Sequence, residues 1–165
     1  VDCPIDPTTS GIEAAAREAR YAAFATVAMS VGAAIVMTAH TADDQAETML
    51  LHLGRGTGMA GMRGIPERRQ LCPGVTVWRP LLHTPRSTVR ATAHAYNVAW
   101  REDASNTDLR FLRNRIRHEL MPVMQRMFGD TVSQRMARTA RVIDDARAVV
   151  DGVLDEVVAK CVTTV

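Results

Sequence analysis

AAIVMTAHTADDQAET (33–48) passes directly from an apolar run into the start of a helix. The run 33–38 is short and continuous, which is typical of a strand buried on both faces in a parallel sheet. Thr41 and Asp44 have the spacing of a capping box, which predicts a helix that continues to about Leu53. A helix predicted over 11–29, capped by Ser10, precedes the strand, and the order helix, strand, helix indicates an α/β fold.

Further elements follow on both sides of a glycine-rich stretch. Residues 54–64 hold five of the ten glycines, which predicts a loop. Residues 1–129 are expected to form an α/β domain and residues 130–165 the start of a helical second region, with the boundary near Gly129. The predicted elements are a strand at 75–81, a helix from Thr84 to about Tyr96, a helix at 105–120 capped by Ser105 and ended by Pro122, and an amphipathic helix at 131–161, weakened at Gly152.

Composition excludes several classes of protein. The chain has 165 residues, 47% hydrophobic and 23% charged, which is enough for a folded core and argues against wholesale disorder. It has no run of 18 apolar residues, so no membrane span is expected. Its three cysteines are scattered, which predicts no disulfide framework and favours the cytoplasm. The chain begins at Val1, and we expect it to be part of a longer protein.

Charge is unevenly distributed along the chain. The net charge of +2 combines a net +6 over residues 61–101 with a net −4 over residues 1–60. A basic block of this kind favours a polyanionic partner, such as nucleic acid or a nucleotide. The alternative is a basic surface that is only solvated.

Four side chains after the buried run share one helical face: His40, Asp43, Asp44 and Glu47. Three carboxylates so close together repel one another unless a cation lies among them, which points to Mg²⁺ or to a substrate ammonium group. The alternative is that Asp43 and Asp44 only stabilise the helix start and that His40 is structural. The opposite face is predicted to meet the core through Ala42, Ala46, Met49 and Leu53.

A second polar stripe lies on the helix predicted at 105–120. Its members recur every three or four residues: Asn106, Arg110, Arg113 and Arg117. Phosphate groups would relieve the repulsion between these arginines through bidentate contacts. The alternative is salt bridges to Glu102, Asp103 or Asp108. The neighbouring apolar face is Leu109, Leu112, Ile116 and Leu120.

The glycine-rich stretch offers a weaker candidate site. Backbone N–H groups near Gly56 and Gly58, together with Arg55, could hold a phosphate. The pattern is neither a Walker A motif nor a dinucleotide fingerprint, so a simple connector is equally consistent with it.

Three stretches together resemble the tRNA(Ile)-lysidine synthetases of the N-type ATP pyrophosphatase (PP-loop) superfamily. They are TAHTADDQAETMLLHLGRGTGMAGMRGI (38–65), WRPLL (78–82) and EDASNTDLRFLRNRIRHELMP (102–122), in the order and spacing of that family. The resemblance implies an adenine-nucleotide alpha hydrolase-like domain with a parallel sheet. It also implies ATP-dependent ligation of free L-lysine to C2 of the wobble cytidine of a CAU anticodon, through an adenylated tRNA(Ile), with release of AMP and pyrophosphate.

The resemblance also implies roles for residues. Asp44 and Glu47 would hold Mg²⁺ or the amino groups of lysine, with Asp43 as a further Mg²⁺ ligand, and His40 would position substrate. Arg113 would contact ATP phosphate or tRNA, with Arg117 as the second choice, and Arg110, Arg55, Gly56 and Gly58 are expected to contribute to binding. Residues 1–129 would be the carboxyl-side part of the synthetase domain of that family, and residues 130–165 the start of its helical substrate- and tRNA-binding region. A homodimer is a further expectation.

One departure from the family pattern is large, because the phosphate loop SGGxDS is absent and the only Ser-Gly pair is Ser10-Gly11. We therefore expect the chain alone to be inactive, and a sheet without its first strand to expose an edge and to be marginally stable or to associate. Two alternatives to the synthetase are a PP-loop ATPase that activates another group, such as a tRNA thiolase, and a non-catalytic RNA-contacting module. The first usually carries cysteine pairs, which this sequence lacks.

Overall fold

The computed structural model describes residues 11–101 and 104–161. They form two compact units. The sheet unit consists of the described residues in 11–39 and 67–80, and the helical unit of those in 40–66 and 81–161. None of the helices within these residues is long and apolar enough to cross a membrane.

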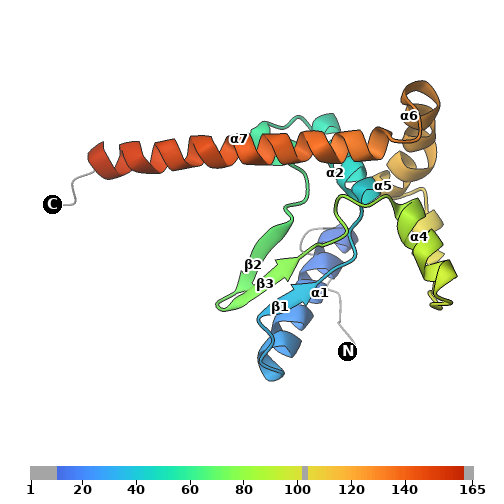
Figure 1. Cartoon of the computed structure of the whole chain (residues 1–165), viewed down its shortest axis with the longest axis horizontal. Helices are drawn as coiled ribbons and strands as arrows, with labels where there is room; N and C mark the ends of the chain where they lie inside the picture. The colour runs from blue at the N-terminus through green and yellow to red at the C-terminus, as the bar shows by residue number, and fades with distance from the viewer. Residues whose placement is uncertain (1–10, 102–103, 162–165) are drawn as a thin grey trace. The chain divides into compact units, whose positions relative to one another are not determined.

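The described part of the sheet unit has one long helix and three short strands, which can be followed in Figure 1. Helix α1 (Gly11–Ser30) confirms the predicted first helix. Gly32 follows the helix with a φ of +67°. The predicted cap, Ser10, lies outside the described residues. The strands are β1 (Ile35–Met37), β2 (Arg68–Cys72) and β3 (Val75–Trp78), in the order β1-β3-β2. β1 pairs parallel to β3 with Val36 opposite Val77, whereas β2 pairs antiparallel to β3 with Arg68 opposite Trp78.

This sheet corrects two expectations. The sheet contains both parallel and antiparallel pairs, because strand β2, which was not predicted, forms a hairpin with β3. The sequence RRQLC of β2 has no apolar pattern, since its first three side chains are exposed. The run around β1 is not buried on both faces: Ile35 is 49% and Met37 62% exposed. Among the described strands β1 pairs with β3 only, so it lies at the edge of the described sheet.

The helical unit is built on α2 (Ala42–Gly54), whose predicted capping box at Thr41 is present. Ala42, Ala46 and Met49 are buried as predicted, while Leu53 is exposed. Helix α7 (Val132–Cys161) confirms the predicted long helix, passes through Gly152 without a break and packs on α2 and on the short α3 (Met59–Met62). The hydrophobic core of this unit contains Ala46, Ile116, Met121 and Val132.

The segment 104–128 differs from the single helix that was predicted at 105–120. A 3₁₀ turn η1 (Ala104–Thr107) is followed by α5 (Leu112–Arg115), a π-helical turn η2 (Ile116–Leu120) and α6 (Met121–Phe128). Asp108 explains the interruption, because its carboxylate accepts from the backbone N–H of Arg110 at 3.0 Å and its carbonyl accepts from the Asn114 side chain at 2.9 Å. Such local bonds compete with a helix.

Pro122 lies inside this helical run instead of ending it. It occupies the first turn of α6, directly after η2. A wider π turn fits a proline there, because proline has no N–H to complete the regular ladder. The predicted apolar face is also mostly wrong: Ile116 is buried, but Leu109, Leu112 and Leu120 are exposed.

Two smaller expectations are adjusted. The stretch 54–64 is not all loop, since it contains α3. Helix α4 (Arg86–Ala95) has Pro85 at its N-cap and no side-chain cap, so Thr84 lies one residue further out than predicted. The predicted domain boundary near Gly129 stays a prediction, although Gly129 does end α6, with a φ of +86°.

Candidate functional site: an ion network on α2

The first turn of α2 fixes the position of the acidic residues. Asp44 Oδ2 accepts hydrogen bonds from the backbone N–H and the hydroxyl of Thr41, both at 2.8 Å. These two bonds hold the Asp44 carboxylate at the N-terminus of the helix, where the dipole favours a negative charge. Glu47 lies one turn further on and so projects from the same face.

Glu47 is the most deeply placed acid of the site, with a side chain only 1% exposed. Its Oε1 accepts from Arg117 Nε at 2.8 Å and from Arg86 Nη2 at 3.1 Å. Its Oε2 accepts from Arg117 Nη2 at 2.9 Å and from Arg113 Nε at 3.2 Å. A buried carboxylate requires such compensation, because an unpaired charge in this position would be strongly unfavourable.

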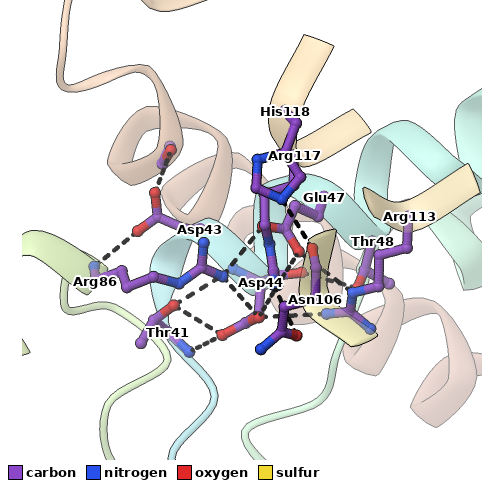
Figure 2. Close-up of polar contacts among 11 residues, drawn as sticks. Thr41, Asp43, Asp44, Glu47, Thr48, Arg86, Asn106, Arg113, Arg117 and His118 are labelled. Atoms are coloured by element: carbon purple, nitrogen blue, oxygen red, sulfur yellow. Dashed lines mark hydrogen bonds and ion pairs between the residues drawn. The ribbon is translucent and has the colours of Figure 1, made fainter. Parts of the chain in front are cut away.

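Asp44 is bound by the same three guanidiniums. Its Oδ1 lies 3.0 Å from Arg86 Nη2, 3.3 Å from Arg117 Nη2 and 3.4 Å from Arg113 Nη2 (Figure 2). Burial alone would raise the pKa of Asp44, but the charge of Arg86, the hydrogen bonds from Thr41 and the charge of Arg113 outweigh it and lower this pKa below its ordinary value. Asp44 is therefore ionised near neutral pH.

Asp43 completes the acidic side through different donors. Its Oδ2 accepts from the backbone N–H of Arg86 at 2.7 Å, and its Oδ1 accepts from the Ser133 hydroxyl of α7 at 3.3 Å. All six carboxylate oxygens thus accept hydrogen bonds from the chain. We call the six residues the ion network: Asp43, Asp44, Glu47, Arg86, Arg113 and Arg117.

The three arginines come from three different elements of the helical unit. Arg86 opens α4, Arg113 lies on α5 and Arg117 on η2. Hydrogen bonding to Glu47 raises the pKa of the Arg117 guanidinium, against the opposing effect of burial. Three carboxylates and three guanidiniums balance, so the ion network carries no net charge.

This arrangement does not suit a resident metal ion. Mg²⁺ needs carboxylate oxygens that are open to it, and here a protein donor occupies each of them. The described residues also contain no group of three or more His, Cys, Asp and Glu side chains placed to hold a metal. The Mg²⁺ ligation predicted for Asp43 and Asp44 stays a prediction.

The structure brings four of the predicted site residues together, Asp44, Glu47, Arg113 and Arg117, with Asp43 beside them. It does not bring in Arg110, which is 88% exposed and paired with Asp108 at 2.7 Å. The predicted phosphate contacts Arg55, Gly56 and Gly58 are exposed in the connection between α2 and α3 and take no part in the ion network. His40 is half-buried one residue before the N-cap, and its role stays a prediction.

Among the described residues, the alternative that neighbours in sequence neutralise the arginine stripe is confirmed for Arg110 only, through Asp108. Arg113 and Arg117 pair with acids about 70 positions away, which no local pattern could reveal. Of the proposed local partners, Glu102 and Asp103 lie outside the described residues. Asn106 does lie beside the stripe, where its side chain accepts from Arg117 Nη1 at 3.5 Å.

Sequence reasoning missed Arg86. A signal was present, because a cation in the first turn of a helix is unfavourable to the helix dipole unless an acid compensates it. Helix α4 has no acidic residue in its first turn. An arginine there therefore indicates an acidic partner elsewhere in the chain.

Comparisons with known proteins place this site in a family context. Residues 1–124 match the PP-loop domain family. A tRNA(Ile)-lysidine synthase of Chromobacterium violaceum is 42% identical over 152 residues, which cover 92% of this chain and 34% of that protein. Proteins of the same name from Salinispora arenicola and Rhodopseudomonas palustris are 45% and 48% identical, over 86% and 71% of this chain and 42% and 33% of theirs. The chain thus spans about a third to two fifths of the length of these relatives.

Proposed function

The chain belongs to the PP-loop domain family, and we propose that it contributes the amine-binding and phosphate-contacting part of an enzyme that forms lysidine on tRNA(Ile). In the proposed reaction the C2 oxygen of the wobble cytidine of a CAU anticodon attacks the α-phosphorus of ATP, and pyrophosphate leaves. The ε-amine of free lysine then bonds to C2 while the C2–O bond breaks, and AMP departs with that oxygen.

The observation that carries the proposal is the ion network itself. The reaction needs acids for the amino groups of lysine and cations for the phosphates of ATP and tRNA. Asp44 and Glu47 supply the acids, and Arg113 and Arg117 supply the cations, within one connected set of contacts. Identity of 42–48% to proteins named tRNA(Ile)-lysidine synthase supports the choice of substrate.

Several finer expectations belong to the same proposal. ATP would enter with Mg²⁺ as its counterion, and His40 would position substrate. The parallel pair β1–β3 supports a parallel nucleotide-binding sheet of the family type. A cytoplasmic place of action and a homodimer stay predictions from the sequence.

The test is transfer of labelled lysine to an unmodified tRNA with a CAU anticodon, in the presence of ATP and Mg²⁺. The 165-residue chain is assayed by itself, and also in a chimera in which it replaces the matched segment of the Chromobacterium violaceum relative. We expect transfer by the chimera, with none to a tRNA that has a GAU anticodon. We expect Glu47→Gln in the chimera to abolish transfer and Glu119→Gln, whose side chain pairs with Arg115 on the surface, to leave it unchanged.

The same assay separates the alternatives. A folded chimera that binds tRNA but transfers no lysine would contradict the ligase and favour the RNA-contacting module. Consumption of ATP with tRNA but without lysine incorporation would favour a PP-loop ATPase that activates another group.

A further inference from the structure

Depth within the ion network follows the sign of charge. The Glu47 side chain is 1% exposed and that of Asp44 15%. The side chains of Arg86, Arg113 and Arg117 are 27%, 29% and 21% exposed, so the arginine side chains are more exposed than those of these two acids. A ligand arriving from solution therefore meets the arginines first.

The acids are already occupied by groups that resemble a substrate amine. A guanidinium and an ammonium group are both cationic donors, and the network holds three guanidiniums where the proposed function requires lysine amino groups to bind. An added ammonium would find every oxygen taken. Removing a guanidinium without a substitute would leave a buried carboxylate with fewer partners for its charge, which is unfavourable.

An anion can relieve this conflict because Arg86 retains side-chain donors that the ion network does not use. Arg86 uses one nitrogen, Nη2, for both Asp44 and Glu47, and no acceptor for its Nε or Nη1 is recorded among the described residues. A phosphate group can take these donors in bidentate form and draw the guanidinium away from the acids. The ammonium group can then take the vacated oxygens.

We propose that the ion network is a composite site that takes a phosphate-class anion on Arg86, Arg113 and Arg117 and an ammonium group on Asp44 and Glu47, each ligand favouring the other. The inference rests on the proposed function and deepens it, because it makes binding of the amine substrate depend on the phosphates of the nucleotide or tRNA. Thermodynamic linkage requires the effect to be reciprocal: the anion tightens the ammonium ligand by the same factor that the ammonium ligand tightens the anion.

Isothermal titration calorimetry on the full chain tests this with two simple probes, L-lysine and inorganic pyrophosphate. We expect pyrophosphate to tighten lysine binding about tenfold, within the usual range of coupling between sites, and lysine to tighten pyrophosphate equally. Norleucine lacks the ε-ammonium group and should show no such gain. Lysine affinity that is unchanged or weakened by pyrophosphate, or lysine that fails to bind even with pyrophosphate present, would overturn the proposal.

A charge variant gives a second readout that a purely structural role for Arg86 would not produce. Arg86→Gln leaves the network with a net charge of −1, so lysine should bind tighter without pyrophosphate, by about threefold or more, and the gain from pyrophosphate should shrink. A scaffold role alone would weaken both ligands together. Arg115→Gln, which removes the same charge from a residue paired with Glu119, is the matched control and should behave as wild type.

The outcomes separate this inference from the proposed function. Lysine transfer by the chimera without coupling between pyrophosphate and lysine would leave the function standing and overturn the coupling. Coupling without transfer to tRNA would support the composite site and contradict the ligase. Circular dichroism of each variant shows whether a loss reflects unfolding.

Discussion

At the scale of single residues, the sequence shows one group of acids and one group of arginines, and the like charges within each group repel. In the structure the two groups neutralise each other. The face of α2 and the stripe on α5 and η2 are complementary halves of one network. The cation needed by the acids and the anion needed by the arginines are therefore partly supplied within the chain. A ligand must compete with these internal partners, which makes its charge and its order of arrival decisive.

Asp44 makes this network sensitive to acid. Its pKa is lowered in the folded chain, so its contribution to the free energy of unfolding is fully present above its unfolded pKa of about 3.9 and is lost as pH falls through the folded pKa. We expect the stability difference between wild type and Asp44→Asn to be constant from pH 7 to about pH 5 and to shrink below about pH 4. Urea unfolding across this range measures it.

The control for this prediction is Asp145→Asn, because Asp145 is exposed on α7 and no contact of its side chain is recorded among the described residues. The difference in the free energy of unfolding between Asp145→Asn and wild type should stay small over the whole pH range. A difference for Asp44→Asn that grows as the solution is acidified would contradict the ion pairing described for this residue.

At the scale of elements, two glycines have opposite consequences. Gly64 has a φ of +65°, and a Cβ there would lie 2.6 Å from Gln45 Oε1, which accepts from the backbone N–H of Ile65. Gly64→Ala should lower the free energy of unfolding by about 1–3 kcal/mol, through strain and displacement of the buried Gln45 side chain. Gly152 lies inside α7, and no atom lies within 4 Å of the position that a Cβ would take. Gly152→Ala should therefore raise the free energy of unfolding by about 0.5–1 kcal/mol.

Urea unfolding of the two variants beside wild type measures both effects. Equal effects in the same direction would show that glycine flexibility, rather than the Gln45 contact, determines the result.

Local patterns predicted the elements whose causes are local. The capping box at Thr41 and the apolar spacing of α7 each lie within one helix, and both predictions are confirmed. Strand β2 was missed because its stability comes from pairing with β3 rather than from apolar side chains. The helix predicted from Ser105 starts later because Asp108 bonds to its own neighbours, a choice that helical spacing does not reveal.

The sequence predicted most residues of the site, but not which acid pairs with which arginine. Helical spacing placed Asp44 and Glu47 on one face, and Arg113 and Arg117 on another. The contact between the faces depends on how α5 and η2 pack beside α2, which is tertiary information. Arg86 lies on a third element, so its membership could be inferred from sequence only through its unfavourable place at a helix start.

At the scale of the whole molecule, the net charge of +2 hides where positive charge is available to a partner. The arginines of the ion network are balanced by acids. In the sheet unit, by contrast, Arg68 stacks on the Trp78 ring at 5.2 Å, and Arg69 and Arg17 stack on the Tyr21 ring at 5.1 and 5.0 Å. Stacking orders a guanidinium and leaves its N–H edges open to phosphate.

We therefore expect the exposed arginines of β2 to contribute to RNA affinity through the phosphate backbone. The double variant Arg68→Gln, Arg69→Gln should weaken tRNA binding and reduce the slope of log K against log salt by about 1.4–1.8, at roughly 0.7–0.9 per phosphate contact. Filter binding at several salt concentrations measures the slope. Arg126→Gln, Arg138→Gln removes the same charge from exposed positions of the helical unit and is the matched control. The two double variants remove the same amount of charge from different places. If both reduce the slope equally, net charge alone attracts RNA and β2 makes no particular contact. If only the β2 variant reduces the slope, a phosphate contact lies on that strand.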